Sequence, residues 1–221
     1  MESSKILEIL LYMIPVILSI TVHEFSHAYV SNRLGDDTAK IMGRMTLNPL
    51  AHIDLFGTII IPAIGILSGV PFFGWAKPVP FNPLKFRRSV RMKHGALMVA
   101  IAGPISNFML ALFVVAVVRI FDLGHSSMTG AAGQISSPLL TFMIVILNVN
   151  VSLAIFNLLP IPPLDGSKIL YGILPDSMIN VVETLEKYSF ILFILLLLFG
   201  GRLIGPPIYA LLRILYTFMF N

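Results

Sequence analysis

Long apolar stretches alternate with shorter polar ones along this chain, and five of the apolar stretches carry few charged residues. About 20 apolar residues are needed to cross the hydrocarbon core of a bilayer as a helix. The pattern therefore predicts an all-α polytopic membrane protein with about five or six transmembrane helices. The predicted spans are residues 5–34, 94–121, 138–159, 188–199 and 203–219, with Gly200 and Gly201 between the last two.

The segments between these spans differ in character. Residues 36–54 are polar, and 160–187 are amphipathic, which predicts a loop and a short helix. Residues 55–76 are uncharged but are interrupted by several glycines and prolines, which suits a re-entrant segment. A full span is the alternative, because an uncharged segment of this length is long enough to cross the membrane. Three prolines in the following run, GWAKPVPFNP, favour extended or turning backbone over helix.

Composition narrows the class of protein further. Of the 221 residues, 57% are hydrophobic and only 12% are charged, which excludes a soluble or a disordered chain. The spans leave no room for a separate soluble domain, so residues 1–221 are expected to form one domain. The chain has no cysteine. Disulfides, thiolate metal sites and cysteine nucleophiles are therefore excluded.

Basic residues predict the orientation. Nine of the fifteen Lys and Arg residues lie between Arg33 and Lys93, whereas residues 122–137 contain none. The positive-inside rule then places 33–54 and 77–93 in the cytoplasm and 122–137 outside. The net charge of +4 is therefore interpreted as a sign of orientation in the membrane, and not of nucleic-acid binding.

The first predicted span carries the motif HEFSH, from His23 to His27. Residues four apart lie on one face of a helix, so both imidazoles can reach one metal ion. Glu24 borders that face and can take a proton from metal-bound water. An alternative is that the histidines end the helix at the membrane interface and that Glu24 faces lipid headgroups.

A catalytic zinc site needs a third protein ligand besides His23 and His27. Asp165, in the sequence NLLPIPPLDG just beyond the third span, is the main candidate, because prolines there can turn the chain back into the protein. The spacing alone allows Asp165 equally well to be a helix N-cap. His52 and Asp54 are weaker candidates and could be loop residues or partners of the ligands.

Several asparagines lie in apolar surroundings, where an amide must be hydrogen-bonded. Asn157, eight residues before Asp165, could bond a backbone carbonyl or could donate to an oxyanion. Asn148 and Asn150 are interpreted as hydrogen bonds between helices. Asn107, in the sequence GPISN, is expected to tie helices together and to support the site from behind the ligands.

Taken together, HEFSH, GPISN and NLLPIPPLDG resemble the site-2 protease family of intramembrane zinc metalloproteases, and GWAKPVPFNP is similar to a loop of its short bacterial members. The resemblance covers nearly the whole chain. It implies one Zn²⁺ per chain, held by His23, His27 and Asp165, with Glu24 as the catalytic base and Asn157 stabilising the tetrahedral intermediate.

The resemblance also implies a membrane-entering hairpin within 36–54, where an edge strand could hold an extended substrate. It implies membrane-protein substrates with a transmembrane helix, the lipid bilayer as partner, and no nucleic acid. The expected location is the plasma membrane of a prokaryote, with the site towards the cytoplasm. Larger relatives carry a PDZ domain, which is not expected here. The oligomeric state and the natural substrate are not predicted.

A second function from another class is a non-catalytic membrane metal-binding protein or a metal transporter. A transporter needs ligands along a path through the whole bilayer. In this chain the ionisable residues at membrane depth gather near one face. That distribution favours the enzyme.

Overall fold

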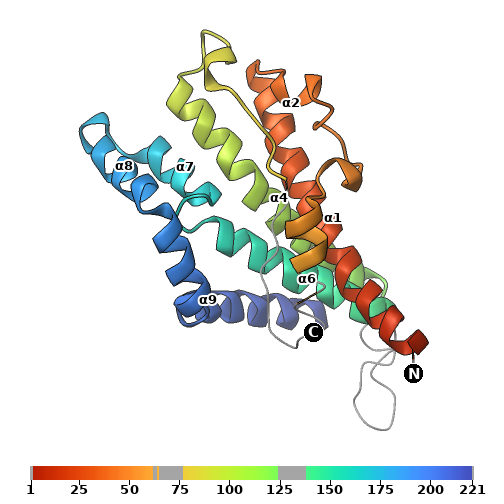
Figure 1. The fold of residues 1–221 in the computed structure, drawn as a ribbon. Helices are drawn as coiled ribbons and strands as arrows, with labels where there is room; N and C mark the ends of the chain where they lie inside the picture. Colours follow the sequence, from red (N-terminus) through yellow and green to blue (C-terminus); the bar gives the residue numbers. More distant parts are fainter. Residues whose placement is uncertain (1, 62–63, 65–76, 124–137, 221) are drawn as a thin grey trace.

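The computed structural model describes residues 2–61, 64, 77–123 and 138–220. Every regular element within these residues is a helix (Figure 1). The elements are α1 (Glu2–Leu34), α2 (Thr38–Ile41), the 3₁₀ turn η1 (Pro49–Ala51), the π-helix η2 (Leu55–Ile60), the 3₁₀ turn η3 (Pro83–Lys85), α4 (Met92–Ile120), α6 (Pro138–Asn157), α7 (Asp165–Ile173), the 3₁₀ turn η4 (Asp176–Met178), α8 (Ile179–Lys187) and α9 (Ser189–Phe220).

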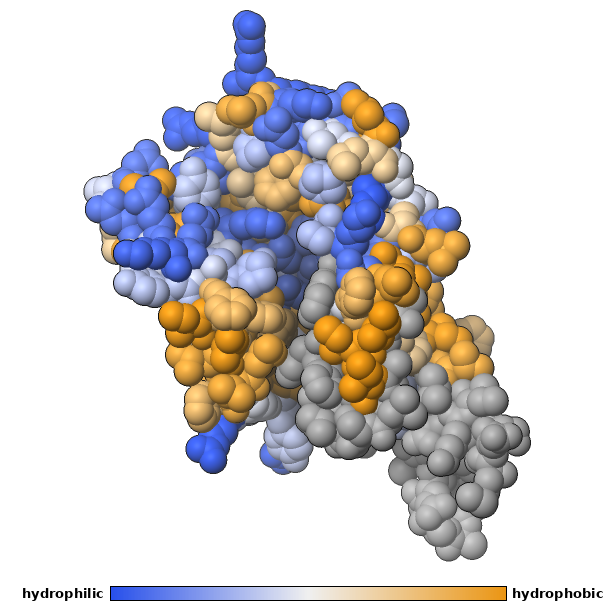
Figure 2. Space-filling view, viewed as in Figure 1, coloured by the Kyte–Doolittle hydropathy of each residue, from blue (hydrophilic) through white to orange (hydrophobic). Residues whose placement is uncertain are grey.

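Four of these helices are long and apolar enough to cross a membrane, judged by length and composition: α1 from Leu10 onward, α4, α6 and α9. The all-α polytopic prediction is confirmed, and the first three spans lie within a few residues of their predicted bounds. Hydrophilic residues gather over the end of the molecule that holds α2 and α8, and hydrophobic residues cover α9 below them (Figure 2).

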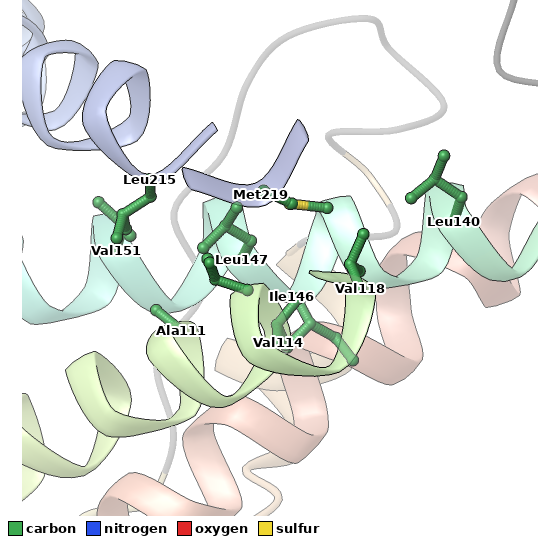
Figure 3. Close-up of a cluster of buried hydrophobic side chains, with 10 residues drawn as sticks. Ala111, Val114, Val118, Leu140, Ile146, Leu147, Val151, Leu215 and Met219 are labelled. Carbon is green, nitrogen blue, oxygen red and sulfur yellow. The ribbon is translucent and has the colours of Figure 1, made fainter. Parts of the chain in front are cut away.

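A core of small and medium apolar side chains joins α4, α6 and α9 (Figure 3). Ala111 and Val114 of α4 pack with Leu147 and Val151 of α6, and all four are almost completely buried. Leu215 of α9 closes the same cluster. Small side chains let helix backbones approach closely. In a bilayer the lipid is as apolar as the side chains, so helices associate through this close packing and not through the hydrophobic effect.

The first helix, α1, ends at Leu34, where the predicted span 5–34 also ends, and Gly35 follows it. Its φ is +113°, a backbone conformation that side chains other than glycine rarely adopt. The amide of Gly35 donates to the Asn32 carbonyl and the amide of Asp36 to the Ser31 carbonyl, so the last carbonyls of the helix are satisfied. The backbone at Arg87 packs against Gly35, since a Cβ there would lie 3.0 Å from the Arg87 nitrogen.

Asp36 fastens the chain that follows α1. Its carboxylate accepts hydrogen bonds from the Ser31 hydroxyl at 2.9 Å and from the Thr38 and Asn82 amides at 3.0 and 2.6 Å. Burial alone would raise the pKa of Asp36, but these bonds outweigh it and hold the pKa below the usual value for aspartate. The segment before Asn82 is thereby held beside α1.

Two expectations about the fold are wrong. The predicted spans 188–199 and 203–219 form the single helix α9, which changes direction along its length (Figure 1). Glycine costs a helix only about 1 kcal/mol, and prolines such as Pro206 and Pro207 can kink a helix without ending it. Residues 36–54 contain no strand; they form α2, η1 and turns. The edge strand expected there is absent.

The segment 55–76 was expected to be re-entrant or to span the membrane. Its first residues form the π-helix η2, which begins with the side chain of Asp54 accepting a hydrogen bond from the Gly57 amide at 2.8 Å. Residues 62–63 and 65–76 lie outside the described part of the chain, as does 124–137 of the predicted outer loop.

Candidate metal centre and active site

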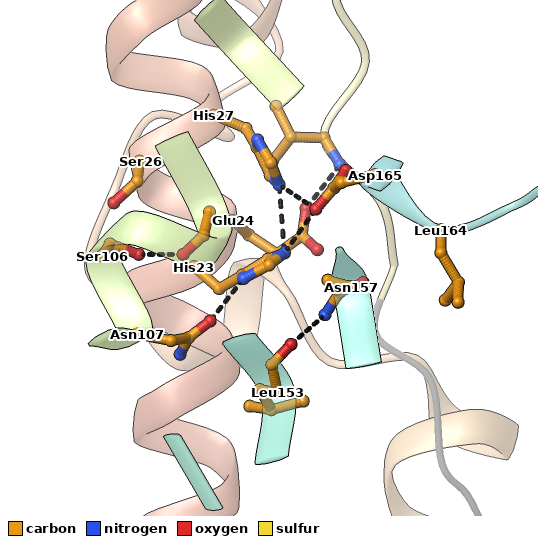
Figure 4. A network of polar contacts seen from close by, with 12 residues as sticks. His23, Glu24, Ser26, His27, Ser106, Asn107, Leu153, Asn157, Leu164 and Asp165 are labelled. Carbon is orange, nitrogen blue, oxygen red and sulfur yellow. Dashed lines mark hydrogen bonds and ion pairs between the residues drawn. The ribbon is translucent and has the colours of Figure 1, made fainter. Parts of the chain in front are cut away.

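Three buried side chains from two distant parts of the chain converge on one point (Figure 4). His23 and His27 lie one turn apart on α1, and Asp165 is the first residue of α7. The Nε2 atoms of the two histidines are 3.1 Å apart, and each lies 3.1 Å from Oδ2 of Asp165. Each of the three residues is only 7% exposed.

The chain between α6 and α7 turns sharply to bring Asp165 back. The backbone of Gly166 packs against the turn that follows α6 so closely that a Cβ there would lie 2.1 Å from the Leu159 carbonyl oxygen. Any side chain at 166 would therefore force this turn away from the start of α7. Leu164, and not Asp165, occupies the N-cap of α7, so the helix-cap alternative for Asp165 is wrong.

Each histidine is oriented by a hydrogen bond from its other ring nitrogen. Nδ1 of His23 lies 2.5 Å from Oδ1 of Asn107, and Nδ1 of His27 lies 2.7 Å from the Val99 carbonyl oxygen. An amide oxygen and a carbonyl oxygen only accept, so both Nδ1 atoms carry a proton and donate it. In neutral imidazoles both Nε2 atoms then present lone pairs to Asp165.

The geometry fits a metal ion. Two nitrogen lone pairs and a carboxylate oxygen thus face one another at 3.1 Å, which is repulsive unless a cation lies among them. Ligand atoms around tetrahedral zinc, at about 2.0–2.1 Å from it, are about 3.3 Å apart. Nitrogen and oxygen donors in this number suit zinc.

Helix α4 supports the two histidines with residues at four-residue intervals. Val99 bonds His27 and Asn107 bonds His23, while Gly103 lies between them, where a Cβ would be 2.5 Å from Cε1 of His23 and from Nε2 of His27. Sequence reasoning gave Gly103 no part in the site. The spacing of 99, 103 and 107, equal to that of the histidines, was the available signal.

Glu24 lies beside the three ligands in a cavity of about 370 Å³. The cavity is also lined by Asn157, Lys168, and apolar residues of α6 and α9, and Figure 2 shows a hollow with hydrophilic residues inside it. Oε2 of Glu24 accepts a hydrogen bond of 2.9 Å from the amide of Val79. Sequence reasoning did not find this contact, because nothing local links residues 55 positions apart.

Arg44 holds the segment that carries Val79. Although only 8% exposed, it directs Nη2 at the carbonyl oxygens of Lys77 and Pro78, each 3.4 Å away. Two carbonyl dipoles thus face the buried guanidinium. The arrangement fixes the backbone immediately before the amide that bonds Glu24.

The remaining predicted site residues lie in different places. Asn157 borders the cavity, half-buried, and its amide donates to the Leu153 carbonyl at 3.0 Å (Figure 4). His52 does not line the cavity; its Nε2 bonds the Thr46 carbonyl oxygen at 2.9 Å. Asp54 caps η2 instead of approaching the ligands.

Comparison with known proteins decides the family. A model described as Peptidase family M50 matches residues 11–199, which is most of the chain. The chain belongs to peptidase family M50. This M50 peptidase is 38% identical over 200 residues to the Bacillus subtilis (strain 168) protein named "Putative zinc metalloprotease YwhC"; the match covers 90% of the chain and 85% of that protein.

A second relative is the Mycolicibacterium smegmatis protein named "Putative zinc metalloprotease Rip2", 28% identical over 184 residues. That match covers 82% of the M50 chain but only 64% of the mycobacterial protein. No solved structure matches. Family membership and the apolar helices together identify an integral membrane zinc metalloprotease of the site-2 type, as the sequence resemblance implied, and they disfavour a metal transporter.

Proposed function

We propose that this M50 peptidase cleaves peptide bonds in or near the transmembrane segments of other membrane proteins, using His23, His27 and Asp165 as zinc ligands. The observation that carries the proposal is the 3.1 Å triangle of Nε2, Nε2 and Oδ2 atoms with Glu24 beside it in one cavity. The cavity is bounded by α1, α6 and α9, which are all candidate membrane spans.

The chain's own residues divide the chemistry among them. A zinc ion in such a site supplies Lewis acidity, which makes water nucleophilic near neutral pH and polarises a carbonyl. Glu24 takes a proton from the attacking water at its carboxylate and later returns one to the leaving amine nitrogen. The Val79 amide, 2.9 Å from Oε2, holds that carboxylate towards the ligands.

Asn157 is proposed to stabilise the negative charge that develops on the substrate carbonyl oxygen. Its Nδ2 atom carries two protons, and the bond to the Leu153 carbonyl uses one of them. That bond holds the amide at the cavity wall, and the second N–H is the donor offered to the oxyanion. Asn107 does not reach the cavity; its proposed role is to orient His23.

The site is proposed to face the cytoplasm from the plasma membrane of a prokaryote. Exposed basic residues gather on the chain that joins η3 to α4, at the same end of the molecule as α2; they are Lys85, Arg87, Arg88 and Arg91. Cytoplasmic loops carry such an excess of Lys and Arg. The two relatives described above are bacterial proteins.

The test is the pair Glu24→Gln and Glu183→Gln. Glu183 lies exposed on α8 and serves as the matched control. In liposomes that contain a protein with one transmembrane helix, Glu24→Gln should cleave at least about 10²-fold more slowly than wild type. It should keep its zinc, because the ligands are intact. Cleavage by Glu24→Gln at the rate of Glu183→Gln would refute the role of Glu24.

A further inference from the structure

Behind His23 lies a group of polar side chains that the proposed chemistry does not use. Ser19 of α1, Asn107 of α4 and Asn150 of α6 are each 0% exposed. They come from three candidate membrane spans and bond one another at the centre of the bundle. Ser and Asn side chains at such a place hydrogen-bond neighbouring helices to one another, and here one of them also contacts His23.

The orientation of the Asn107 amide depends on its neighbours. Nδ2 of Asn107 lies 2.7 Å from Oδ1 of Asn150 and 3.2 Å from the Ser19 carbonyl oxygen, and both of these atoms only accept. Both amide protons of Asn107 are therefore used in these two hydrogen bonds. Oδ1 of Asn107 is left to face His23, where it accepts from Nδ1.

Asn150 is itself held in one orientation. Its Nδ2 donates to the Ile146 carbonyl and to the Ser19 hydroxyl, each at 2.8 Å. The Ser19 hydroxyl in turn donates to the Pro15 carbonyl at 2.7 Å. Backbone carbonyls can only accept hydrogen bonds. The carbonyls of Ile146 and Pro15 therefore fix which group donates in each bond of the network that leads to His23.

We propose that Asn150 is a positioning residue for zinc, acting on His23 through Asn107. By presenting Oδ1 to Asn107, it keeps the Asn107 amide from turning over. The proton of His23 then stays on Nδ1 and the lone pair of Nε2 stays on the side of His27 and Asp165. The inference rests on the zinc site proposed above, and it assigns to Asn150 more than the helix contact expected from the sequence.

Asn148 provides a matched control on the same helix. It lies two residues away, and its Oδ1 accepts a hydrogen bond of 2.9 Å from the Tyr216 hydroxyl of α9. Loss of Asn148 thus removes a partly buried interhelical bond without touching the network behind His23. A merely structural role for Asn150 would make the two variants behave alike.

The experiment measures zinc affinity by competition with a chelator, and melting temperature, for wild type, Asn150→Leu and Asn148→Leu in detergent. Mutations of residues that orient a metal ligand typically weaken binding by about 10–100-fold. We expect that loss in Asn150→Leu and none in Asn148→Leu, whatever each does to melting. Equal zinc affinity in Asn150→Leu and wild type would overturn the proposal.

Three further variants keep the test decisive. Asn150→Asp, protonated in this apolar setting, still offers an acceptor to Asn107 and a donor to Ile146, and it should bind zinc nearly as wild type does. If Asn150→Leu does not fold, Asn150→Ser should show the loss of zinc affinity instead. The serine hydroxyl can bond the Ile146 carbonyl but is too short to reach Asn107. If His23→Ala binds zinc as wild type does, the zinc site itself is wrong, and the two failures are thereby distinguished.

Discussion

Gly103 of α4 lies so close to His23 of α1 that a Cβ at 103 would be 2.5 Å from Cε1 of the imidazole and 2.6 Å from its Nε2 atom. The same Cβ would lie 2.5 Å from Nε2 of His27. Real Cβ contacts are not this short, so one extra methyl group must displace both ligands. The proposed metal site thus depends on a residue that carries no ligand atom.

Gly103→Ala should therefore lower zinc affinity by at least about tenfold, as the loss of a ligand's support does. Gly201→Ala on α9 is the control, because nothing lies within 4 Å of a Cβ at that position. It should leave zinc affinity unchanged and, since alanine favours helix, raise stability by about 0.5–1 kcal/mol. Equal zinc titrations for the two variants would contradict the contact.

Asn157→Ala separates two roles of one amide. If Asn157 donates to the oxyanion, turnover in a cleavage assay should fall by about 10²–10³-fold. Zinc content should stay the same, because that bond forms only during the reaction. If the bond to the Leu153 carbonyl is its whole role, melting temperature should fall while turnover per folded molecule survives. The second pattern would remove Asn157 from the mechanism.

The Val79 amide can be tested by removing its proton. Val79→Pro lacks the N–H that bonds Oε2 of Glu24, whereas Val79→Ala keeps it. Hydrogen bonds to charged groups contribute about 1.5–3 kcal/mol, so turnover of Val79→Pro should fall by about 10–100-fold. Zinc content should not change in either variant. Comparable turnover in the two variants would show that Glu24 needs no such support.

Orientation in the membrane can be read from single cysteines, since the chain has none of its own. Ser89 is exposed before α4, and Phe121, 69% exposed, follows its last turn. Ser89→Cys should react with a membrane-impermeant thiol reagent only when the cytoplasmic side is open, and Phe121→Cys should react from outside. Reaction of both from one side would contradict the topology.

Much of the site was predictable because its signals are local. The four-residue spacing of His23 and His27 places both imidazoles on one helical face, whatever surrounds the helix. The predicted end of the first span at residue 34 is also the end of α1, where Gly35 takes a positive φ. These features follow from backbone geometry over a few residues.

The contacts that sequence reasoning missed join distant segments. Val79 meets Glu24 and Gly103 meets His23 only because whole helices and loops pack in one arrangement. Asn150 looked like an ordinary interhelical amide, since nothing local reveals that its partner orients a ligand. The error over α9 has the opposite origin: two glycines were taken as a break, although a glycine costs a helix only about 1 kcal/mol.

The central claim is that His23, His27 and Asp165 hold one zinc ion. Zinc X-ray absorption spectroscopy of the purified protein tests it most directly. We expect about one zinc per chain with nitrogen and oxygen ligands at about 2.0–2.2 Å and no sulfur. The spectrum should carry the scattering signature of two imidazoles in wild type and of one in His27→Ala. Two imidazoles persisting in His27→Ala, or no bound zinc in wild type, would contradict the account.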